Sequence, residues 1–530
     1  MGTKLSELQK EKIREIDDIA SVSFNQEQKA IAKKIIENTP DSDLHEVFNF
    51  ITQRVKLGFV FDEAPEVNHN AVSFVRENEN LNINITNLEN LAGNIEHKLI
   101  IGENYDALKN LLVTHYEKID VIYIDPPYNT EAMKGDGNDY KDEISANKFI
   151  YRDKFTRNGW LNMMNERLKL ARKLLKDSGV IFISIDDSEQ AYLKVLCDEI
   201  FGEGNFVCDF IRKTKSTTND AKTGVNIQHE NCLCYAKDKS KINLLGGEKD
   251  LSKYSNPDND PNGAWVSDNP SAKSGTMENG YFGVTNPYTC KVDYPPQGRF
   301  WLFSQNTMQK HINEGRICFK KEYKENERGF IYKRYLKDLK TTKKTFDSLK
   351  FISNEFMNQA ATKELLSLEM AELFTYPKPI EFIKGVLSHA TNKDSIVLDF
   401  FAGSGTTAQA VMELNTEDGG RRECILVTNN ENNIAINVTR ERLYRVINGE
   451  GSKGEPIKWQ YSKDKKCLEG NSVRVFEIET HELSLKDLEK AQDLTNIAKG
   501  ELQKLNPEYD INDELKIYSE LASLNPQKDK

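Results

Sequence analysis

Short segments dominated by apolar residues alternate with longer amphipathic stretches through much of the chain. The short segments are too brief for typical helices, and several end in residues that cannot continue a ladder, which is typical of buried strands. They lie at 98–101, 121–124, 179–185, 206–215, 228–237, 396–398 and 424–427. The amphipathic stretches, with apolar positions at helical spacing, lie at 105–115, 155–177 and 380–388. This alternation predicts an α/β sheet.

The alternation is lost at both ends of the chain and in its middle. Residues 1–90 have mixed charge with apolar residues at helical spacing, and the charged stretch at 451–530 also favours helices. Between 241 and 365, glycine, proline, asparagine and aromatic residues become frequent. We therefore expect helical terminal regions and a separate domain inserted into the sheet.

The strand at 121–124 runs into Asp125-Pro126-Pro127-Tyr128. Proline cannot continue a ladder, so these residues are expected at the carboxyl end of the strand, where open parallel sheets bind ligands. The prolines restrict the backbone and remove donors, which leaves the Asp125 carboxylate and the Pro126 carbonyl as acceptors for an amino group. Tyr128 offers a flat face on which a base can stack. An ordinary strand-to-loop turn is the alternative interpretation of so short a motif.

A glycine-rich turn follows the strand at 396–398. In Asp399-Phe400-Phe401-Ala402-Gly403-Ser404-Gly405-Thr406, the two glycines permit a positive φ and a close backbone approach, and the next helix begins with unpaired N–H groups. The third glycine of a dinucleotide fingerprint and the lysine of a phosphate-binding loop are missing, which favours a nucleoside without phosphates. A plain strand-to-helix turn is again the alternative.

Together the two motifs resemble those of DNA methyltransferases that modify amino groups. Asp-Pro-Pro-Tyr is similar to the catalytic motif of that family, and Asp-Phe-Phe-Ala-Gly-Ser-Gly-Thr to its S-adenosylmethionine motif. Their order, catalytic motif first, resembles the β class of adenine-N6 enzymes, and above all the modification subunit of type III restriction-modification systems. The resemblance spans about residues 95 to 450 and implies a Rossmann-like methyltransferase core with an inserted target-recognition domain.

The resemblance assigns a role to each region of the chain. The expected regions are an N-terminal helical region at 1–90, the catalytic part of the core at 91–240, the target-recognition domain at 241–365, the cofactor-binding part at 366–450, and a C-terminal helical region at 451–530.

The implied reaction is methyl transfer from S-adenosylmethionine to the N6 amino group of an adenine flipped out of double-stranded DNA. The implied catalytic residues are Asp125, Pro126, Pro127 and Tyr128. The implied cofactor-binding residues are Asn104, Phe374, Lys378, Asp399, Phe401, Ala402, Gly403, Ser404, Gly405, Thr406 and Glu431. No covalent intermediate is needed, and the chain has no Pro-Cys dipeptide of the kind that cytosine carbon-5 enzymes use.

Several other positions resemble the family less closely. Glu103 stands before Asn104 where the family usually has Asp, and Glu431 is the first acid after the strand at 424–427, so the ligand of the cofactor ribose stays open. His229 resembles a residue near the target-base pocket. Asp186 and Asp187 are expected to cap the next helix, and no metal site is predicted. The stretch 130–151, rich in Gly, Asn and Asp, is expected to close over the flipped base.

The charge distribution bears on the nucleic-acid partner. The formal net charge of −11 by itself disfavours binding to phosphates. However, 13 Lys or Arg against 6 Asp or Glu lie between Lys310 and Lys350, interleaved with aromatic residues. In the context of the resembled family this stretch favours contact with double-stranded DNA. A solvated helix face, or a strand that buries its aromatic side chains, is the alternative.

Composition and cysteine content indicate the class of protein. Hydrophobic residues make up 38% of the chain, and no apolar run approaches the length of roughly 20 residues that a membrane span needs. Eight cysteines without a Cys-x-x-Cys pair predict reduced thiols and no zinc site. We therefore expect a cytoplasmic protein without membrane contact.

Two other functions stay open at this point. The chain could serve chiefly as the DNA-reading subunit of a restriction complex, or it could methylate RNA or a protein amide. A homodimer and a helicase-nuclease restriction subunit are the protein partners that the resemblance leaves open.

Overall fold

The computed structural model describes most of the chain, which divides into two compact units. The first unit comprises residues 1–243 and 347–530, and the second comprises residues 244–346. The described residues are 6–18, 26–41, 43–44, 47–48, 51, 67–85, 94–129, 157–217, 224–457, 466–482, 488–508 and 521–524. The stretch expected to close over the base, at 130–151, lies outside them.

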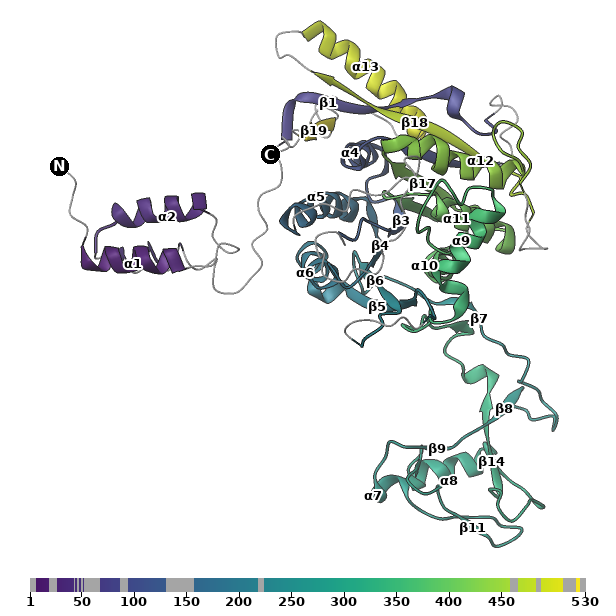
Figure 1. Cartoon of the computed structure of the whole chain (residues 1–530). Coiled ribbons are helices and arrows are strands. Elements are labelled where there is room, and N and C mark those ends of the chain that lie inside the picture. Colours follow the sequence, from purple (N-terminus) through teal and green to yellow (C-terminus); the bar gives the residue numbers. More distant parts are fainter. Residues whose placement is uncertain are drawn as a thin grey trace. The chain divides into compact units, whose positions relative to one another are not determined.

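Within the described residues, a ten-stranded mixed sheet forms the centre of the first unit (Figure 1), in the order β19-β1-β18-β2-β17-β16-β3-β4-β6-β5. The strands are β1 Val67–Glu77, β2 Ile95–Ile101, β3 Ile119–Ile124, β4 Leu175–Ile185, β5 Phe206–Lys213, β6 His229–Ala236, β16 Ile396–Asp399, β17 Glu423–Thr428, β18 Asn471–Glu482 and β19 Ala522–Leu524. Those from β18 to β4 run parallel, and β6 returns antiparallel to β4. The central strands β3 and β16 are almost entirely apolar, as expected where helices cover both faces of a parallel sheet.

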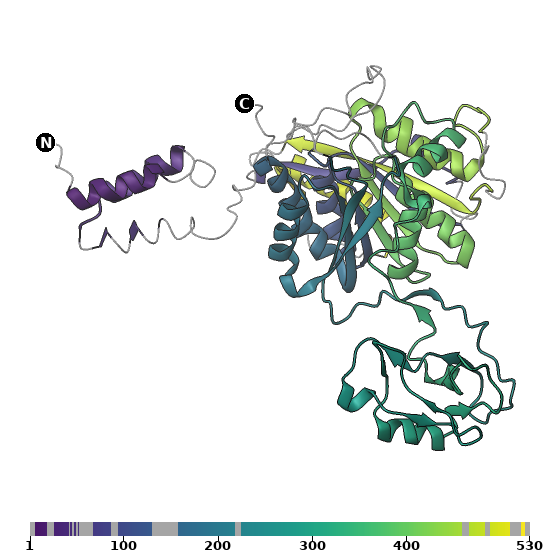
Figure 2. The ribbon, with the colours of Figure 1, turned by 60° about the horizontal axis from the view of Figure 1, so that its bottom comes forward.

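Helices cover the two faces of this sheet (Figure 1, Figure 2). On one face, α4 packs against α5 and α13, and α5 packs against α6; on the other, α11 packs against α10 and α12. Their bounds are α4 Asn104–His115, α5 Arg157–Leu174, α6 Gln190–Phe201, α9 Asn358–Ser367, α10 Ile380–Ala390, α11 Thr406–Asp418, α12 Glu441–Asn448 and α13 Leu488–Leu505. The predicted α/β class, with a Rossmann-like layered core, is confirmed.

The strand order reverses its direction of growth between β3 and β16. These strands are parallel neighbours, with Val121 beside Val397 and Ile122 beside Leu398. From β3 the chain passes through α5 to β4 on one side, and from β16 it passes through α11 to β17 on the other. Because the two connections diverge, the carboxyl ends of β3 and β16 mark the point at which an open sheet binds its ligand.

The terminal regions are less helical than the sequence analysis expected. Helices α1 Glu7–Asp18 and α2 Gln26–Glu37 lie in the first region. However, the expectation of helix is wrong for β1 and for β18, which pair antiparallel with each other, while β18 also lies parallel to β2. Val473 and Val475 of β18 are fully buried, with the alternation of a strand. Sheet pairing therefore outweighed the charge that had suggested a solvated helix.

The second unit is built from short strands and two helices in its described residues. A sheet with the order β13-β14-β8 joins Ile317–Phe319, Phe330–Tyr335 and Trp265–Asp268. The remaining elements are β7 Gly246–Glu248, β9 Ser271–Ala272, β10 Val284–Thr285, β11 Val292–Asp293, β12 Phe300–Trp301, β15 Lys343–Lys344, α7 Met277–Gly280 and α8 Gln305–Asn313. Val284, Trp301, Met308, Ile317 and Phe330 form its core.

The second unit is shorter than the region 241–365 that the sequence analysis set apart. Residues 347–365 belong to the first unit, where the buried Phe351 ring packs edge-on against Phe382, 4.7 Å between centroids. The roles assigned to these regions stay a prediction.

Short helices also connect the strands and longer helices of the described residues. The short helices are Glu79–Leu81, Glu203–Asn205, Leu336–Asp338, Asn354–Phe356 and Glu431–Asn433, with a π-helix at Ala435–Arg440. The eight cysteines are all free thiols in the structure. Among the helices of the described ranges, none combines the length and the apolar character needed to cross a membrane.

Candidate functional site

The loop after β3, Asp125–Asn129, is held in place by two hydrogen bonds. The indole Nε1 of Trp160 donates to the Pro127 carbonyl at 2.7 Å. The side-chain amide of Asn129 donates to Glu189 Oε1 at 2.9 Å, and Asn129 itself takes a left-handed conformation with φ of +59°. Trp160 and Asn129 are both fully buried. These contacts, together with the two prolines, hold Asp125 and Tyr128 in a rigid turn at the sheet edge.

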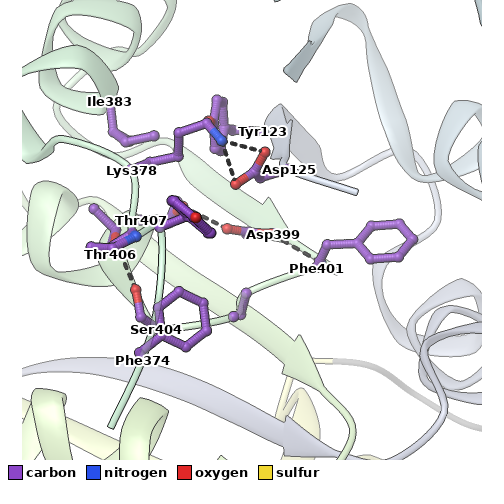
Figure 3. Close-up of a pocket in the computed structure, with 14 residues that line it drawn as sticks. Tyr123, Asp125, Phe374, Lys378, Ile383, Asp399, Phe401, Ser404, Thr406 and Thr407 are labelled. Atoms are coloured by element: carbon purple, nitrogen blue, oxygen red, sulfur yellow. Dashed lines mark hydrogen bonds and ion pairs between the residues drawn. The ribbon is translucent and has the colours of Figure 1, made fainter. Parts of the chain in front are cut away.

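Lys378 reaches the turn at Asp125 from the loop before α10. Its ammonium donates to both carboxylate oxygens of Asp125 at 2.7 Å, as Figure 3 shows. The same nitrogen lies 4.8 Å from the centroid of the Tyr128 ring. The sequence analysis had placed Lys378 among the cofactor ligands, whereas here it bonds to the side chain proposed for catalysis.

A second buried ion pair adjoins the first. Arg212 Nε on β5 donates to Glu230 Oε1 on β6 at 2.7 Å, with side chains that are 1% and 7% exposed. Glu230 Oε1 also lies 3.8 Å from the Lys378 ammonium. Two acids and two bases therefore form one charge-balanced cluster beside Tyr128.

This cluster sets the protonation of the turn. Burial raises the pKa of Asp125 above its ordinary value, and Glu230 adds to the rise, while the Lys378 ammonium opposes it. Burial would likewise raise the pKa of Glu230, but Arg212 and Lys378 hold that pKa below its usual range. Burial and the Asp125 and Glu230 carboxylates raise the pKa of Tyr128 far above 10, so Tyr128 is a neutral phenol. Removing Lys378 should therefore favour a protonated Asp125.

The glycine-rich loop after β16 is built from backbone contacts. Gly403 and Gly405 have φ of +50° and +76°, and Gly405 directly precedes the first residue of α11. The Ala402 N–H donates to the Val427 carbonyl at 3.0 Å, and the Thr439 hydroxyl donates to the Gly403 carbonyl at 2.6 Å. A Cβ on Gly405 would lie 3.3 Å from Thr439 Cγ2. The positive φ values and this close approach explain why glycine stands at these positions.

A buried arginine supports the glycine-rich loop through hydrogen bonds. Arg442 of α12 is 1% exposed and donates to Ser404 Oγ at 3.0 Å, to Thr406 Oγ1 at 2.8 Å and to Gln409 Oε1 at 2.7 Å. Burial lowers the pKa of Arg442 to about 10, so it stays charged at neutral pH. The Ser404 and Thr406 hydroxyls therefore fix the shape of the loop as well as line it.

Asp399, the last residue of β16, has the most perturbed carboxyl of this loop. It is 2% exposed and accepts from the Phe401 N–H at 3.0 Å and from the Thr407 hydroxyl at 2.6 Å. Burial raises the pKa of Asp399 to about 7, against the two hydrogen bonds, which lower it. Its charge therefore changes near neutral pH, and a cation placed beside it would favour the ionised form.

The two loops share one cavity, which is partly open to solvent (Figure 3). It is lined by Tyr123, Asp125, Phe374, Tyr376, Pro377, Lys378, Ile383, Asp399, Phe401, Ala402, Gly403, Ser404, Thr406 and Thr407. The Asp125 carboxylate and the glycine-rich loop, 274 positions apart from Asp125 to Asp399, thus meet at one site.

Some predicted site residues lie outside this lining. Asn104 instead donates to the Phe400 carbonyl at 2.9 Å and accepts from Arg167, so it braces the neighbouring backbone. Glu431 is exposed in the turn after β17. Pro126, Pro127, Tyr128 and Gly405 adjoin lining residues without lining the cavity themselves. The predicted roles of all these residues stay predictions.

The structure also locates two other positions named from the sequence, His229 and Asp186. His229 is exposed at the start of β6. The Asp186 carboxylate accepts from the Ser188 N–H at 2.9 Å, close to the start of α6, and burial raises its pKa to about 6. Among the described residues, no group of three or more His, Cys, Asp and Glu side chains is arranged to hold a metal ion.

Several site residues were not singled out from the sequence. Tyr123, Tyr376, Pro377, Ile383 and Thr407 also line the cavity. Glu230 and Arg212 escaped notice because each sits in an ordinary strand. The available signal was the charged Glu230 at the start of the apolar strand that contains Cys232, since a buried charge needs a partner.

Some residues of the basic aromatic stretch between Lys310 and Lys350 have internal partners, although most of its Lys and Arg side chains are exposed. Phe330 and Tyr335 are fully buried, and the Lys333 ammonium pairs with Asp258 and Asp260. Arg316 pairs with Asp338. This agrees with the alternative of a strand that buries its aromatic residues.

Exposed tyrosines lie elsewhere in the second unit. Tyr281 and Tyr294 are 41% and 54% exposed, with ring centroids 5.6 Å apart. Tyr288 is 60% exposed, and the Lys321 ammonium lies 5.4 Å from its ring centroid. Tyr288 thus presents an exposed aromatic face beside a positive charge.

Known proteins resemble the chain over most of its length. Residues 119–444, more than half of the chain, match a family described as DNA methylase, and residues 9–121 match a family described as an uncharacterised conserved protein. The chain is 35% identical over 414 residues to the StyLTI Mod subunit of a type III restriction-modification enzyme of Salmonella typhimurium, covering 72% of this chain and 59% of that subunit.

Two further relatives have similar ranges. The EcoPI Mod subunit of Escherichia phage P1, also from a type III restriction-modification enzyme, is 32% identical over 400 residues, covering 66% of this chain and 59% of the relative. The type II methyltransferase M.KpnI of Klebsiella pneumoniae is 30% identical over 379 residues, covering 66% of this chain and 85% of the relative. The chain thus spans about 59% of the length of the two Mod subunits.

Proposed function

The chain belongs to the DNA methylase family, and from this premise we propose that it is a site-specific DNA methyltransferase of a restriction-modification system. The proposed target is the N6 amino group of adenine in double-stranded DNA, and the proposed cofactor is S-adenosylmethionine. The observation that carries the proposal is the shared cavity, in which Asp125 and the loop Asp399–Thr406 converge from neighbouring parallel strands.

The lining of the cavity fits this cofactor. S-adenosylmethionine supplies an activated methyl group on a positively charged sulfur. The lining residues include two carboxylates, Asp125 and Asp399, against one cation, Lys378, which suits a cationic ligand better than a phosphate. Phe374 and Phe401 offer apolar rings, and the turn at Gly403 gives the ligand access to backbone groups.

The residues of the catalytic turn would act on the amino group. The target base must leave the duplex, at a cost of a few kcal/mol that stacking on Tyr128 offsets. The Asp125 carboxylate and the Pro126 carbonyl accept the two amino hydrogens, which withdraws the nitrogen lone pair from the ring and aims it at the methyl group. Since Trp160 and Asn129 fix this turn, little reorganisation is needed when the base arrives.

Adenine is proposed over the cytosine amino group on the residue type at position 125. The family modifies both kinds of amino group, and the Asp-Pro-Pro-Tyr form of the motif resembles its adenine enzymes. The carboxylate offers a full negative charge to the amino hydrogens, stronger than a hydroxyl would.

The second unit is the proposed DNA-reading part. Its exposed Tyr281, Tyr288 and Tyr294, with Lys321, replace the buried aromatic residues of Lys310–Lys350 as the proposed contact surface. Aromatic faces beside basic side chains suit contact with bases and phosphates. A restriction subunit and a second copy of the chain are the proposed protein partners, by analogy with the Mod subunits, and the proposed location is the cytoplasm.

The test is transfer of labelled methyl groups from S-adenosylmethionine to unmethylated genomic DNA, followed by sequencing of the modified positions. We expect N6-methyladenine at one short sequence motif with the wild-type chain and none with Asp125→Ala. Methylation of cytosine would overturn the choice of base. Incorporation into RNA or protein but not DNA would overturn the DNA substrate, and cofactor binding without any transfer would favour a chain that only reads DNA.

A further inference from the structure

The Lys378 ammonium occupies the place where the proposed mechanism puts the target amino group. It donates to both oxygens of Asp125 at 2.7 Å, the acceptor assigned to the amino hydrogens. It also lies 4.8 Å from the centroid of the Tyr128 ring, the surface assigned to the base. One nitrogen therefore makes two of the three contacts that the mechanism assigns to a flipped base, so the base and Lys378 compete for one site. This reasoning rests on the proposed function.

Glu230 offers the ammonium a second position. Its Oε1 atom lies 3.8 Å from Lys378 Nζ, and its side chain is 7% exposed. Arg212 holds this carboxylate by the 2.7 Å bond from Nε, and Arg212 is itself held by the Phe356 carbonyl at 2.6 Å and by Asn358 Oδ1 at 2.8 Å. Glu230 is thus a fixed, ionised acceptor beside the pocket.

Moving between the two acids would keep the lysine paired. Leaving a buried ammonium without a partner is costly, whereas a shift of about one bond length from Asp125 toward Glu230 exchanges one carboxylate for another. The flexible four-carbon stem of lysine permits such a shift. Asp125 would then be free to accept from the base.

We propose that Lys378 fills the target-base pocket of the empty enzyme as a stand-in for the target amino group, and that Glu230 is the positioning residue that receives its ammonium when the base enters. The lysine is thereby a gate on base entry. Asp125 stays paired with the lysine, and so unavailable to stray amines, until DNA supplies a base that can displace it.

The experiment uses the full chain and a duplex that carries the methylation motif mapped with the wild-type enzyme. The target adenine is kept and 2-aminopurine replaces its neighbour in the strand, where the fluorescence rises when the adenine leaves the stack. We expect Lys378→Ala to increase the flipped signal several-fold, because the competitor is gone. Glu230→Gln should decrease it several-fold, because the ammonium stays on Asp125; the new amide oxygen can still accept from Arg212.

The double variant separates a positioning role from a merely structural one. If Glu230 acts through the lysine, Glu230→Gln has no further effect on flipping in the Lys378→Ala background. Equal and additive effects of Glu230→Gln in both backgrounds would overturn the proposal, as would a decrease of the flipped signal in Lys378→Ala.

The pH profile of single-turnover methylation gives a second readout on adenine-containing duplex. In Lys378→Ala the acid limb should move to higher pH, since the ammonium that favours the ionised Asp125 is lost. An unmoved acid limb would contradict the pairing. Lys378→Gln, which keeps a polar side chain, should shift the limb in the same direction and serves if the alanine variant does not fold.

Lys384→Ala is the matched control. Lys384 is as buried as Lys378, 11% against 10% exposed, and pairs with Glu413 and Glu417 on the side of α10 and α11 without lining the cavity. It should leave flipping and the pH profile unchanged. A wild-type chain that methylates no DNA would mean that the proposed function fails, whereas an active wild type with unaltered flipping in the variants would overturn only the gate.

Discussion

The two loops that line the cavity leave neighbouring parallel strands, yet they are built in opposite ways. After β3, the turn at Asp125 is stiffened by prolines and presents charged and aromatic side chains, with Lys378 bonded to the carboxylate. After β16, the loop around Gly403 presents backbone and is shaped by left-handed glycines, with the charge of Arg442 placed beneath it. We expect the loop after β3 to act through its side chains and the loop after β16 through the course of its backbone.

This difference follows from what each loop is proposed to hold. Chemistry on an amino group needs acceptors at fixed positions, which side chains on a rigid turn supply. Holding a nucleoside needs close approach to the main chain, which only small residues allow. The comparison predicts that removing a side-chain charge damages the rate after β3, whereas adding a single carbon damages binding after β16.

The largest expected effect separates rate from binding. Asp125→Asn keeps the shape of the side chain but removes its charge and one acceptor, so single-turnover methylation should fall by about 100-fold or more, as for other groups that stabilise a transition state. The cofactor dissociation constant, measured by calorimetry, should change by less than about threefold, since Asp125 is only one of its lining residues. Equal losses in both quantities would contradict the division between the loops.

Tyr128 should matter through its ring. Tyr128→Ala should weaken binding of the flipped base by about 1–3 kcal/mol, the usual contribution of base stacking. Tyr128→Phe keeps the ring and should stay within about threefold of the wild type, because the neutral phenol carries no charge that the mechanism uses. The measurement is single-turnover methylation of DNA, with cofactor affinity as the control that neither variant should alter.

Much of this division could be predicted from the sequence, because both loops are local. Apolar runs placed β3 and β16, prolines ended one, and glycines marked the turn after the other. The pairing of Lys378 with Asp125 could not be predicted, since 253 positions separate the two residues and only the sheet order brings them together. The same applies to Arg442, which lies in a helix with no motif of its own.

The terminal strands and the second unit show the same limit. The charged stretch at 451–530 predicted helix, whereas β18 forms a strand because it pairs with β1 and β2. In the second unit, the charges of Lys333 and Arg316 look available in the sequence, but acids from distant positions neutralise them. Local sequence patterns predict many of the helices and strands. Which strands pair, and which charged side chains form ion pairs, depends on three-dimensional packing.

A substitution at one of its glycines tests the role of the loop after β16. Gly405→Ala forces a left-handed alanine, φ +76°, with Cβ 3.3 Å from Thr439 Cγ2, so the loop must move. Stability should fall by about 1–2 kcal/mol, and cofactor affinity should fall by roughly tenfold.

Gly419→Ala, at the other end of α11, is the matched control for this change. Gly419 is also left-handed, φ +66°, but nothing lies within 4 Å of its added Cβ. It should lose similar stability in thermal unfolding and no cofactor affinity. If both variants lose cofactor affinity equally, the path of the loop at Gly405 has no special role.

Asp399 is a charged side chain that belongs to the glycine-rich loop, so it combines the features of both loops. The smallest effect is expected at this residue. Its pKa is about 7 in the folded protein against about 4 in an unfolded chain, so the folded state binds the extra proton between these values. Relative to Asp399→Asn, the wild type should therefore lose stability as pH rises from about 4 to 7.

At pH 8, Asp399→Asn should be the more stable protein by about 1–2 kcal/mol, after weaker hydrogen bonds to Phe401 and Thr407 are set against the relief of a buried charge. At pH 4 this advantage should vanish, because the wild-type carboxyl is then neutral as well. Denaturant unfolding at both pH values measures the difference, and the same stability gain at pH 4 and pH 8 would exclude titration of Asp399 as its cause. Cofactor affinity should nevertheless fall, since the carboxylate that costs stability in the empty cavity is the one that favours a cationic ligand.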